Sequence, residues 1–77
     1  METNEENISR NIKALRVKRG LNQEQTALLL NMSKPTYINI EKHPLSVSIN
    51  KLLQVAECLQ CSLNEFFLTN QFTESEK

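Results

Sequence analysis

Side chains that match the edges of DNA bases occur together in the segment 34–42: Lys34, Thr36, Ile38 and Asn39. A lysine donates hydrogen bonds to guanine O6 and N7 or to a phosphate, and an asparagine pairs with both the N6 and the N7 positions of adenine. Threonine offers a hydroxyl and a methyl group, and isoleucine can contact the methyl group of thymine. One helix that presented all four to solvent would have the chemistry needed to read a major groove.

The same segment has the signals of a short, exposed helix. Ser33 is a good N-cap, and Pro35 falls in the first turn, where a missing N–H costs nothing. Tyr37 and Ile40 are three residues apart, so they share one face and can pack inward, which leaves the four candidate base-contacting residues to face outward. The pair His43-Pro44 then ends the helix near residue 41 or 42.

A second helix is expected directly before this one. Asn22 is an N-cap, and Gln25 completes a capping box for a helix that reaches Leu30. Asn31 suits a left-handed backbone position. The connection is therefore a turn over 31–33 alone, and so short a turn forces two helices to cross steeply, which is the helix-turn-helix geometry.

The rest of the chain also has helical periodicity, and no segment alternates as a strand does. A first helix is expected over Glu5–Arg19, ended by Gly20. After Ser48 a fourth helix has an apolar face made by Ile49, Leu52, Leu53, Ala56 and Leu59. The capping box Ser62–Glu65 opens a short fifth helix that carries Phe66 and Phe67. The fold class is all-α, with a polar segment 1–7, a folded domain 8–69 and a polar tail 70–77.

Charge is distributed unevenly along the chain. The formal net charge is zero, which by itself argues against nucleic acid as a partner. Between Ile8 and Lys51, however, lie eight basic and two acidic residues, a net charge of +6, and the other acids lie near the two ends. Such an asymmetry can present a basic face on a neutral protein, although an ordinary solvated surface would have the same composition.

Several function classes lack their residues in this sequence. The longest apolar run, Ala27–Leu30, is far too short for a membrane span, which needs about 20 residues. The acidic start of the chain has no basic and apolar export signal, so we expect a soluble, cytoplasmic protein. With one histidine, no aspartate and no glycine loop, no catalytic set is evident. We therefore expect no enzyme and no small-molecule substrate.

Cys58 and Cys61 form a lone Cys-x-x-Cys. Structural zinc needs four ligands, and the only histidine, His43, lies in another segment. A thioredoxin-type pair would open a helix, whereas this pair falls at the end of a helical pattern. We interpret both cysteines as small packing residues or free thiols, and we expect no metal and no cofactor.

Seven residues together resemble the helix-turn-helix of the phage repressor and Cro family, also called the XRE family: Gln23, Ala27, Asn31, Met32, Tyr37, Ile40 and Glu41. The stretch 21–27, Leu-Asn-Gln-Glu-Gln-Thr-Ala, is similar to that family's usual Leu-Ser-Gln-Glu-Glu-Leu-Ala, although Thr26 stands where a buried Leu is usual. The resemblance covers about Ile8 to Phe67. It implies a five-helix lambda-repressor-like domain, and the length is also similar to that of restriction–modification controller proteins, which belong to the same broad family.

The resemblance implies roles for residues outside the segment 34–42. Gln23 is similar to the family glutamine that braces the recognition helix and touches a DNA phosphate. Arg16 and Glu41 are similar to the family's structural ion pair between the first helix and the end of the third, and such a pair fixes orientation more surely than it adds stability. We further expect Lys42 and Ser46 to contact the DNA backbone beyond the third helix.

The leading hypothesis is a homodimeric, sequence-specific regulator of transcription, repressor or activator, that binds a palindromic site on double-stranded DNA. Apolar residues near the C-terminus exceed what so short a segment buries alone, and some of them are expected to form the dimer interface: Phe66, Phe67, Leu68 and Phe72. The alternative is an antitoxin-like or coactivator-like module that binds a protein partner through Leu28, Leu29 and the C-terminal phenylalanines.

Overall fold

Each α-helix in the described part of the chain, residues 4–68 of a computed structural model, begins at a polar cap. The caps are Asn4, Asn22, Ser33 and Ser48, and each side chain accepts a hydrogen bond from a backbone N–H in the first turn of its helix. The helices that follow are α1 (Glu5–Lys18), α2 (Gln23–Leu29), α3 (Lys34–Lys42) and α4 (Ile49–Cys58). Two 3₁₀ helices, η1 (Pro44–Ser46) and η2 (Leu63–Phe67), complete the order.

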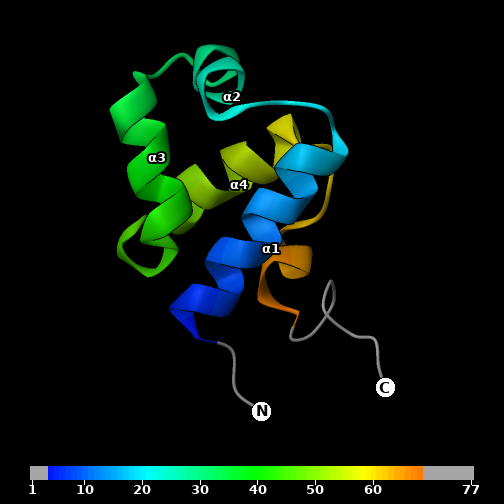
Figure 1. The fold of residues 1–77 in the computed structure, drawn as a ribbon. Helices are drawn as coiled ribbons and strands as arrows, with labels where there is room; N and C mark the ends of the chain where they lie inside the picture. Colours follow the sequence, from blue (N-terminus) through cyan, green and yellow to red (C-terminus); the bar gives the residue numbers. More distant parts are fainter. Residues whose placement is uncertain (1–3, 69–77) are drawn as a thin grey trace.

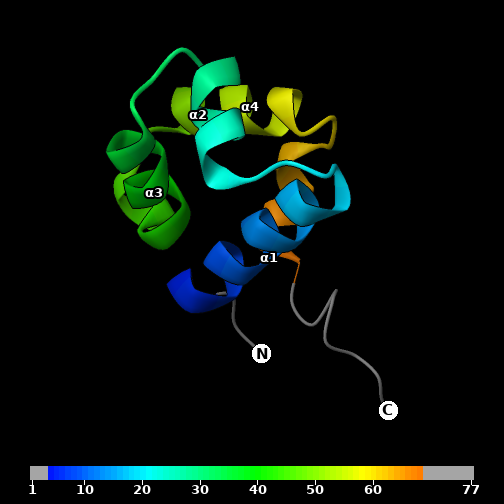
Figure 2. The ribbon, with the colours of Figure 1, turned by 45° about the horizontal axis from the view of Figure 1, so that its top comes forward.

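The helix-turn-helix predicted from the sequence is confirmed in its local geometry. Asn31 has a φ of +59°, the left-handed conformation that ends α2. The N–H of Met32 donates to the carbonyl of Ala27 at 3.0 Å, so the carbonyls at the end of α2 are satisfied as in a Schellman motif. Figures 1 and 2 show α3 at one edge of the molecule, with α2 packed at its N-terminal end and α1 beside it.

The expectation of a fifth α-helix was wrong, because that segment is the 3₁₀ helix η2. Its capping box, Ser62 with Glu65, is present as predicted. Asn11 of α1, however, donates its side-chain amide to the carbonyls of Phe66 at 2.9 Å and Leu68 at 2.6 Å. These carbonyls therefore bond α1 instead of continuing a helical ladder, and the backbone at Leu68 is extended.

The core lies between α1, α2, α3, α4 and η2. Its members are fully or almost fully buried: Ile8, Ile12, Leu15, Ala27, Tyr37, Ile40, Leu52, Val55, Ala56, Leu59 and Phe66. On α4 the expected apolar face was too broad, since Ile49 and Leu53 are 54 % and 43 % exposed. Leu53 lies about 100° around the helix from Leu52, and Ile49 lies in the first turn at the edge of the buried stripe.

Thr26 is a polar residue at an interior position of α2. It donates its hydroxyl hydrogen to the carbonyl of Asn22 at 2.9 Å, so this buried polar side chain leaves no unsatisfied group.

Among residues 4–68, no helix combines the length and the hydropathy that a membrane span requires.

Gln60 provides a test of the backbone at the end of α4. It has a φ of +58° without the local hydrogen bonding that makes Asn tolerant of this region, and its side chain is exposed. We expect Gln60→Gly to raise the free energy of unfolding by about 0.5–1 kcal/mol, because relief of the left-handed conformation exceeds the added entropy of the unfolded chain. Asn31→Gly is the matched control and should change stability less. Urea unfolding measures both, and a loss of stability in Gln60→Gly would contradict the assignment of strain.

Candidate nucleic-acid interface

The four predicted base-contacting side chains lie on α3, and three of them are exposed. Lys34, Thr36 and Asn39 face solvent, while Ile38 is half-buried. Thr36 also shares a hydrogen bond of 2.8 Å with the hydroxyl of Ser33, so its hydroxyl is partly engaged at the helix cap. The polar face of α3 is thus not packed inside the chain, and it retains the donors and acceptors that a major groove would require.

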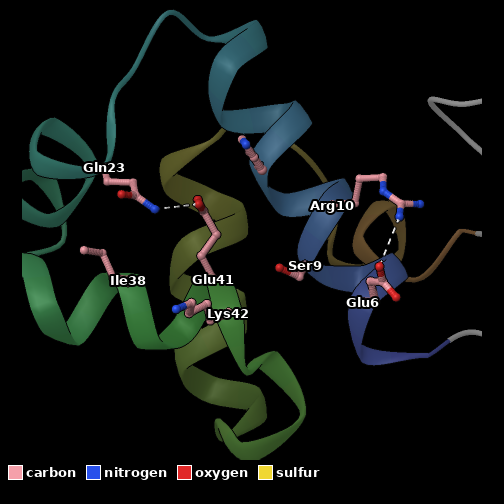
Figure 3. Close-up of a pocket in the computed structure, with 8 residues that line it drawn as sticks. Glu6, Ser9, Arg10, Gln23, Ile38, Glu41 and Lys42 are labelled. Atoms are coloured by element: carbon pink, nitrogen blue, oxygen red, sulfur yellow. Dashed lines mark hydrogen bonds and ion pairs between the residues drawn. The ribbon is translucent and has the colours of Figure 1, made fainter.

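The opposite face of α3 is held by one buried carboxylate. Glu41 is 4 % exposed, and both of its oxygens accept two hydrogen bonds. Arg16 of α1 donates from Nε to Oε2 at 2.7 Å and from Nη2 to Oε1 at 3.2 Å. Tyr37 donates its hydroxyl to Oε2 at 2.6 Å. Gln23 donates from Nε2 to Oε1 at 3.0 Å, the bond drawn in Figure 3.

This network changes the proton affinity of its members in a consistent direction. Burial by itself raises the pKa of Glu41, but the donors Arg16, Tyr37 and Gln23 outweigh it, so the pKa of this carboxyl lies below its usual value. Burial next to the carboxylate raises the pKa of Tyr37. For Arg16, the loss of solvation lowers its pKa and the pairing with Glu41 raises it, with a net increase. All three groups therefore keep one protonation state at neutral pH.

The three residues expected to contact the DNA backbone differ in their availability. Lys42 is exposed and has no ion-pair partner within residues 4–68. Gln23 is half-buried and uses one N–H on Glu41, which leaves its carbonyl oxygen and second N–H. Ser46 lies in η1 and donates its hydroxyl hydrogen to the carbonyl of His43 at 2.8 Å. A phosphate contact from Ser46 would have to replace that bond.

The C-terminal apolar residues do not form one exposed patch. Phe66 is completely buried in the core, so it is not available for a dimer interface. Phe67 packs against the core, and Leu68 is 44 % exposed. Phe72, the other residue expected at that interface, lies outside the described residues.

The two cysteines are half-buried free thiols. Burial raises the pKa of both the Cys58 and the Cys61 thiol, and the Glu65 carboxylate raises that of Cys61 further. A raised pKa disfavours the thiolate that redox chemistry and metal binding require. Within residues 4–68, no three His, Cys, Asp or Glu side chains come close enough to hold a metal ion.

Three structural roles were not predicted from the sequence. Tyr37 was expected only to pack inward, yet its hydroxyl also donates a hydrogen bond to the buried Glu41 carboxylate. Asn11 holds η2, and its place between Ile8 and Leu15 on the buried stripe of α1 was the available signal. Arg19 donates from Nε to the carbonyl of Leu59 at 2.8 Å, and so caps the end of α4. Nothing in the local sequence indicates that long-range partner.

Comparison with known families agrees with this geometry. The pattern of a family described as Helix-turn-helix, that of the XRE or Cro/C1-type regulators, matches residues 12–66, more than two thirds of the chain. The chain belongs to this helix-turn-helix family. The family is one of DNA-binding regulators and generally not of enzymes. Comparisons with curated proteins and with solved structures found no match.

The ion pair of this helix-turn-helix protein is testable by a double-mutant cycle. Arg16→Met leaves a buried carboxylate without its cation, and we expect it to lower the free energy of unfolding by about 3–5 kcal/mol. Adding Glu41→Leu removes the orphaned charge and should restore most of that loss. Urea unfolding of Arg16→Met, of Glu41→Leu alone and of the double variant measures the cycle. A double variant no more stable than Arg16→Met would contradict this account. If Arg16→Met does not fold, Tyr37→Phe is the milder substitution that tests the same network. It removes one hydrogen bond to Glu41 and should lower the free energy of unfolding by about 1.5–3 kcal/mol.

The lowered pKa of Glu41 also predicts a pH dependence. A carboxyl whose pKa is lower in the folded state stabilises the fold above its unfolded pKa, near 4.5, and this contribution is lost as the pH falls through the folded value. The advantage of the wild type over Glu41→Gln should therefore be full at neutral pH and should shrink in strong acid. Unfolding by urea across an acid pH series measures it, with Glu57→Gln on the exposed face of α4 as control. An advantage of constant size would refute the assignment.

Proposed function

We propose that this chain is a sequence-specific regulator of transcription that reads the major groove with α3. The proposal rests on one observation, that the two faces of α3 have different environments. One face is locked to α1 and α2 through Glu41, and the other presents Lys34, Thr36 and Asn39 to solvent. A helix that is held rigidly from behind can place its outer side chains against base edges reproducibly.

Each outward residue has a distinct proposed role. Lys34 donates to guanine O6 and N7, and Asn39 forms paired hydrogen bonds with adenine. Thr36 and Ile38 supply methyl contacts to thymine, and the Thr36 hydroxyl supplies one polar contact. Gln23, Lys42 and Ser46 contact phosphates and set the register of the protein on the duplex, without reading sequence themselves.

A homodimer is the proposed binding form. Two copies related by a two-fold axis place two recognition helices about one DNA turn, roughly 34 Å, apart on a palindromic site. Leu68 and Phe72 are the C-terminal apolar residues proposed for the interface, since Phe66 is committed to the core.

One observation favours the alternative, a protein-interaction module. Leu28 and Leu29 on α2 are 73 % and 64 % exposed, which is unusual for adjacent large apolar side chains. In the alternative they bind a protein partner, and the basic residues serve only solubility. The two functions differ in their salt dependence on duplex DNA, because a protein-interaction module has no phosphate contacts to lose.

Selection of bound sites from random duplexes tests the proposed function. The wild type should recover inverted repeats with half-sites about one turn apart. Asn39→Ala should relax the preference at one base position by about 1–3 kcal/mol while the other positions keep theirs. Lys42→Ala is the matched control, because a phosphate contact weakens all sites alike. If Asn39→Ala left every base preference unchanged, α3 would not read bases as proposed. If the wild type showed no salt-dependent duplex binding, the alternative would be favoured.

A further inference from the structure

A groove lies between α1 and α3, next to the proposed reading face. It has a volume of about 370 Å³ and opens to solvent. Figure 3 shows its two walls, with Ser9 on the α1 side and Ile38, Glu41 and Lys42 on the α3 side. Lys13 also lines it. Because Ile38 and Lys42 belong both to this groove and to α3, the groove is continuous with the surface proposed to contact DNA.

The groove presents donors that have no partner inside the protein. Lys13 of α1 and Lys42 of α3 are exposed, one on each wall, and neither forms an ion pair within residues 4–68. Ser9 of α1 lines the groove as well, and its hydroxyl forms no hydrogen bond within residues 4–68. Two lysines and a serine that line one groove form a donor set suited to a phosphate group.

The carboxylates at the groove do not cancel these charges equally. Glu41 already accepts four hydrogen bonds, and its charge is balanced by the buried Arg16. Glu6 forms only a surface pair with Arg10, at 3.6 Å with Glu6 82 % exposed. Such a pair is weak and easily exchanged. The uncompensated charge of the groove is therefore positive, and Glu6 is the one acidic group that opposes an incoming anion.

We propose that this groove binds a backbone phosphate of the same duplex whose major groove α3 enters, with Ser9 and Lys13 as contacts from α1. The inference rests on the proposed function. A helix in a major groove has a sugar-phosphate strand along each side, and α1 is the element beside α3 at this edge. The strand on that side must pass the groove, and its phosphates meet the lysines of both walls. Glu6 weakens this contact by repulsion and so limits non-specific binding.

The test compares two lysines of the same helix. Lys13→Ala and Lys18→Ala each remove one exposed positive charge from α1, but only Lys13 lines the groove. Binding to a short mixed-sequence duplex is followed by fluorescence anisotropy over a series of salt concentrations. Lys13→Ala should lower the magnitude of the log–log salt slope by about 0.9, the value for one phosphate contact, and Lys18→Ala should leave the slope unchanged. Circular dichroism checks that both variants are folded.

Glu6→Gln supplies a change in the opposite direction. Removing the opposing charge should tighten duplex binding roughly two- to fivefold, as expected for one exposed charge interaction. Ser9→Ala should weaken binding without a change of slope, since a neutral hydroxyl displaces no counterion.

The outcomes separate this proposal from the proposed function. Equal salt slopes for Lys13→Ala and Lys18→Ala, with a wild type that still binds duplex DNA, would overturn the groove contact and leave α3 as the reading element. A wild type without duplex binding would overturn both. Titration with inorganic phosphate at constant ionic strength tests the other source of the anion. Amide shifts at Ser9 and Lys13 with free phosphate, combined with an unchanged salt slope in Lys13→Ala, would assign the groove to a small anion and overturn the DNA contact.

Discussion

A carboxylate removed from water must have all of its oxygen lone pairs satisfied, and the arrangement of this protein follows from how Glu41 meets that requirement. A carboxylate accepts about four hydrogen bonds, and removing such a charge from water without them costs several kcal/mol. The four hydrogen bonds come from three residues on three helices: two from Arg16 of α1, one from Gln23 of α2 and one from Tyr37 of α3 itself. Any rotation of α3 would break several of these bonds together, so the helix has one permitted orientation.

That constraint acts on geometry more than on net stability. The attraction of a buried ion pair is largely offset by the loss of hydration, and its worth lies in penalising every alternative arrangement. Arg16 extends the effect, because Nη1 also donates to the carbonyl of Leu21, in the connection between α1 and α2. Tyr37 lies in the middle of α3 and its ring packs in the core. Its hydroxyl donates a hydrogen bond to Glu41, which lies one turn further along the same helix. Apolar burial thus holds α3 in place, while the carboxylate determines its rotation.

The sequence predicts the features of this fold that depend on neighbours in the chain. The structure confirms the features that are local signals in the sequence. These are the caps at Asn22, Ser33 and Ser48, the left-handed backbone of Asn31, and the inward-facing pair of Tyr37 and Ile40. The errors occur where distant segments decide. The prediction of a fifth α-helix was wrong because Asn11, more than fifty residues away in the chain, donates hydrogen bonds to carbonyls of that segment. The hydrogen bond from the Tyr37 hydroxyl was missed because a hydrophobic pattern does not show where a single polar atom points. The ion pair was available only through the family resemblance, since Arg16 and Glu41 are far apart in sequence.

Net charge illustrates the same distinction between composition and position. The chain is formally neutral, and on composition alone a polyanion is a poor partner. In three dimensions the acids are not equivalent, because Glu41 is buried and held by internal donors, whereas Glu5 accepts a hydrogen bond from the backbone N–H of Leu45. Lys13 and Lys42 have no ion-pair partner in the described part of the chain. What an approaching strand of phosphates meets depends on which charges the fold has already paired. The buried pair of Arg16 and Glu41 withdraws one positive and one negative charge together, and the charges left at this edge of α3 are those of the exposed lysines, unpaired within the described residues.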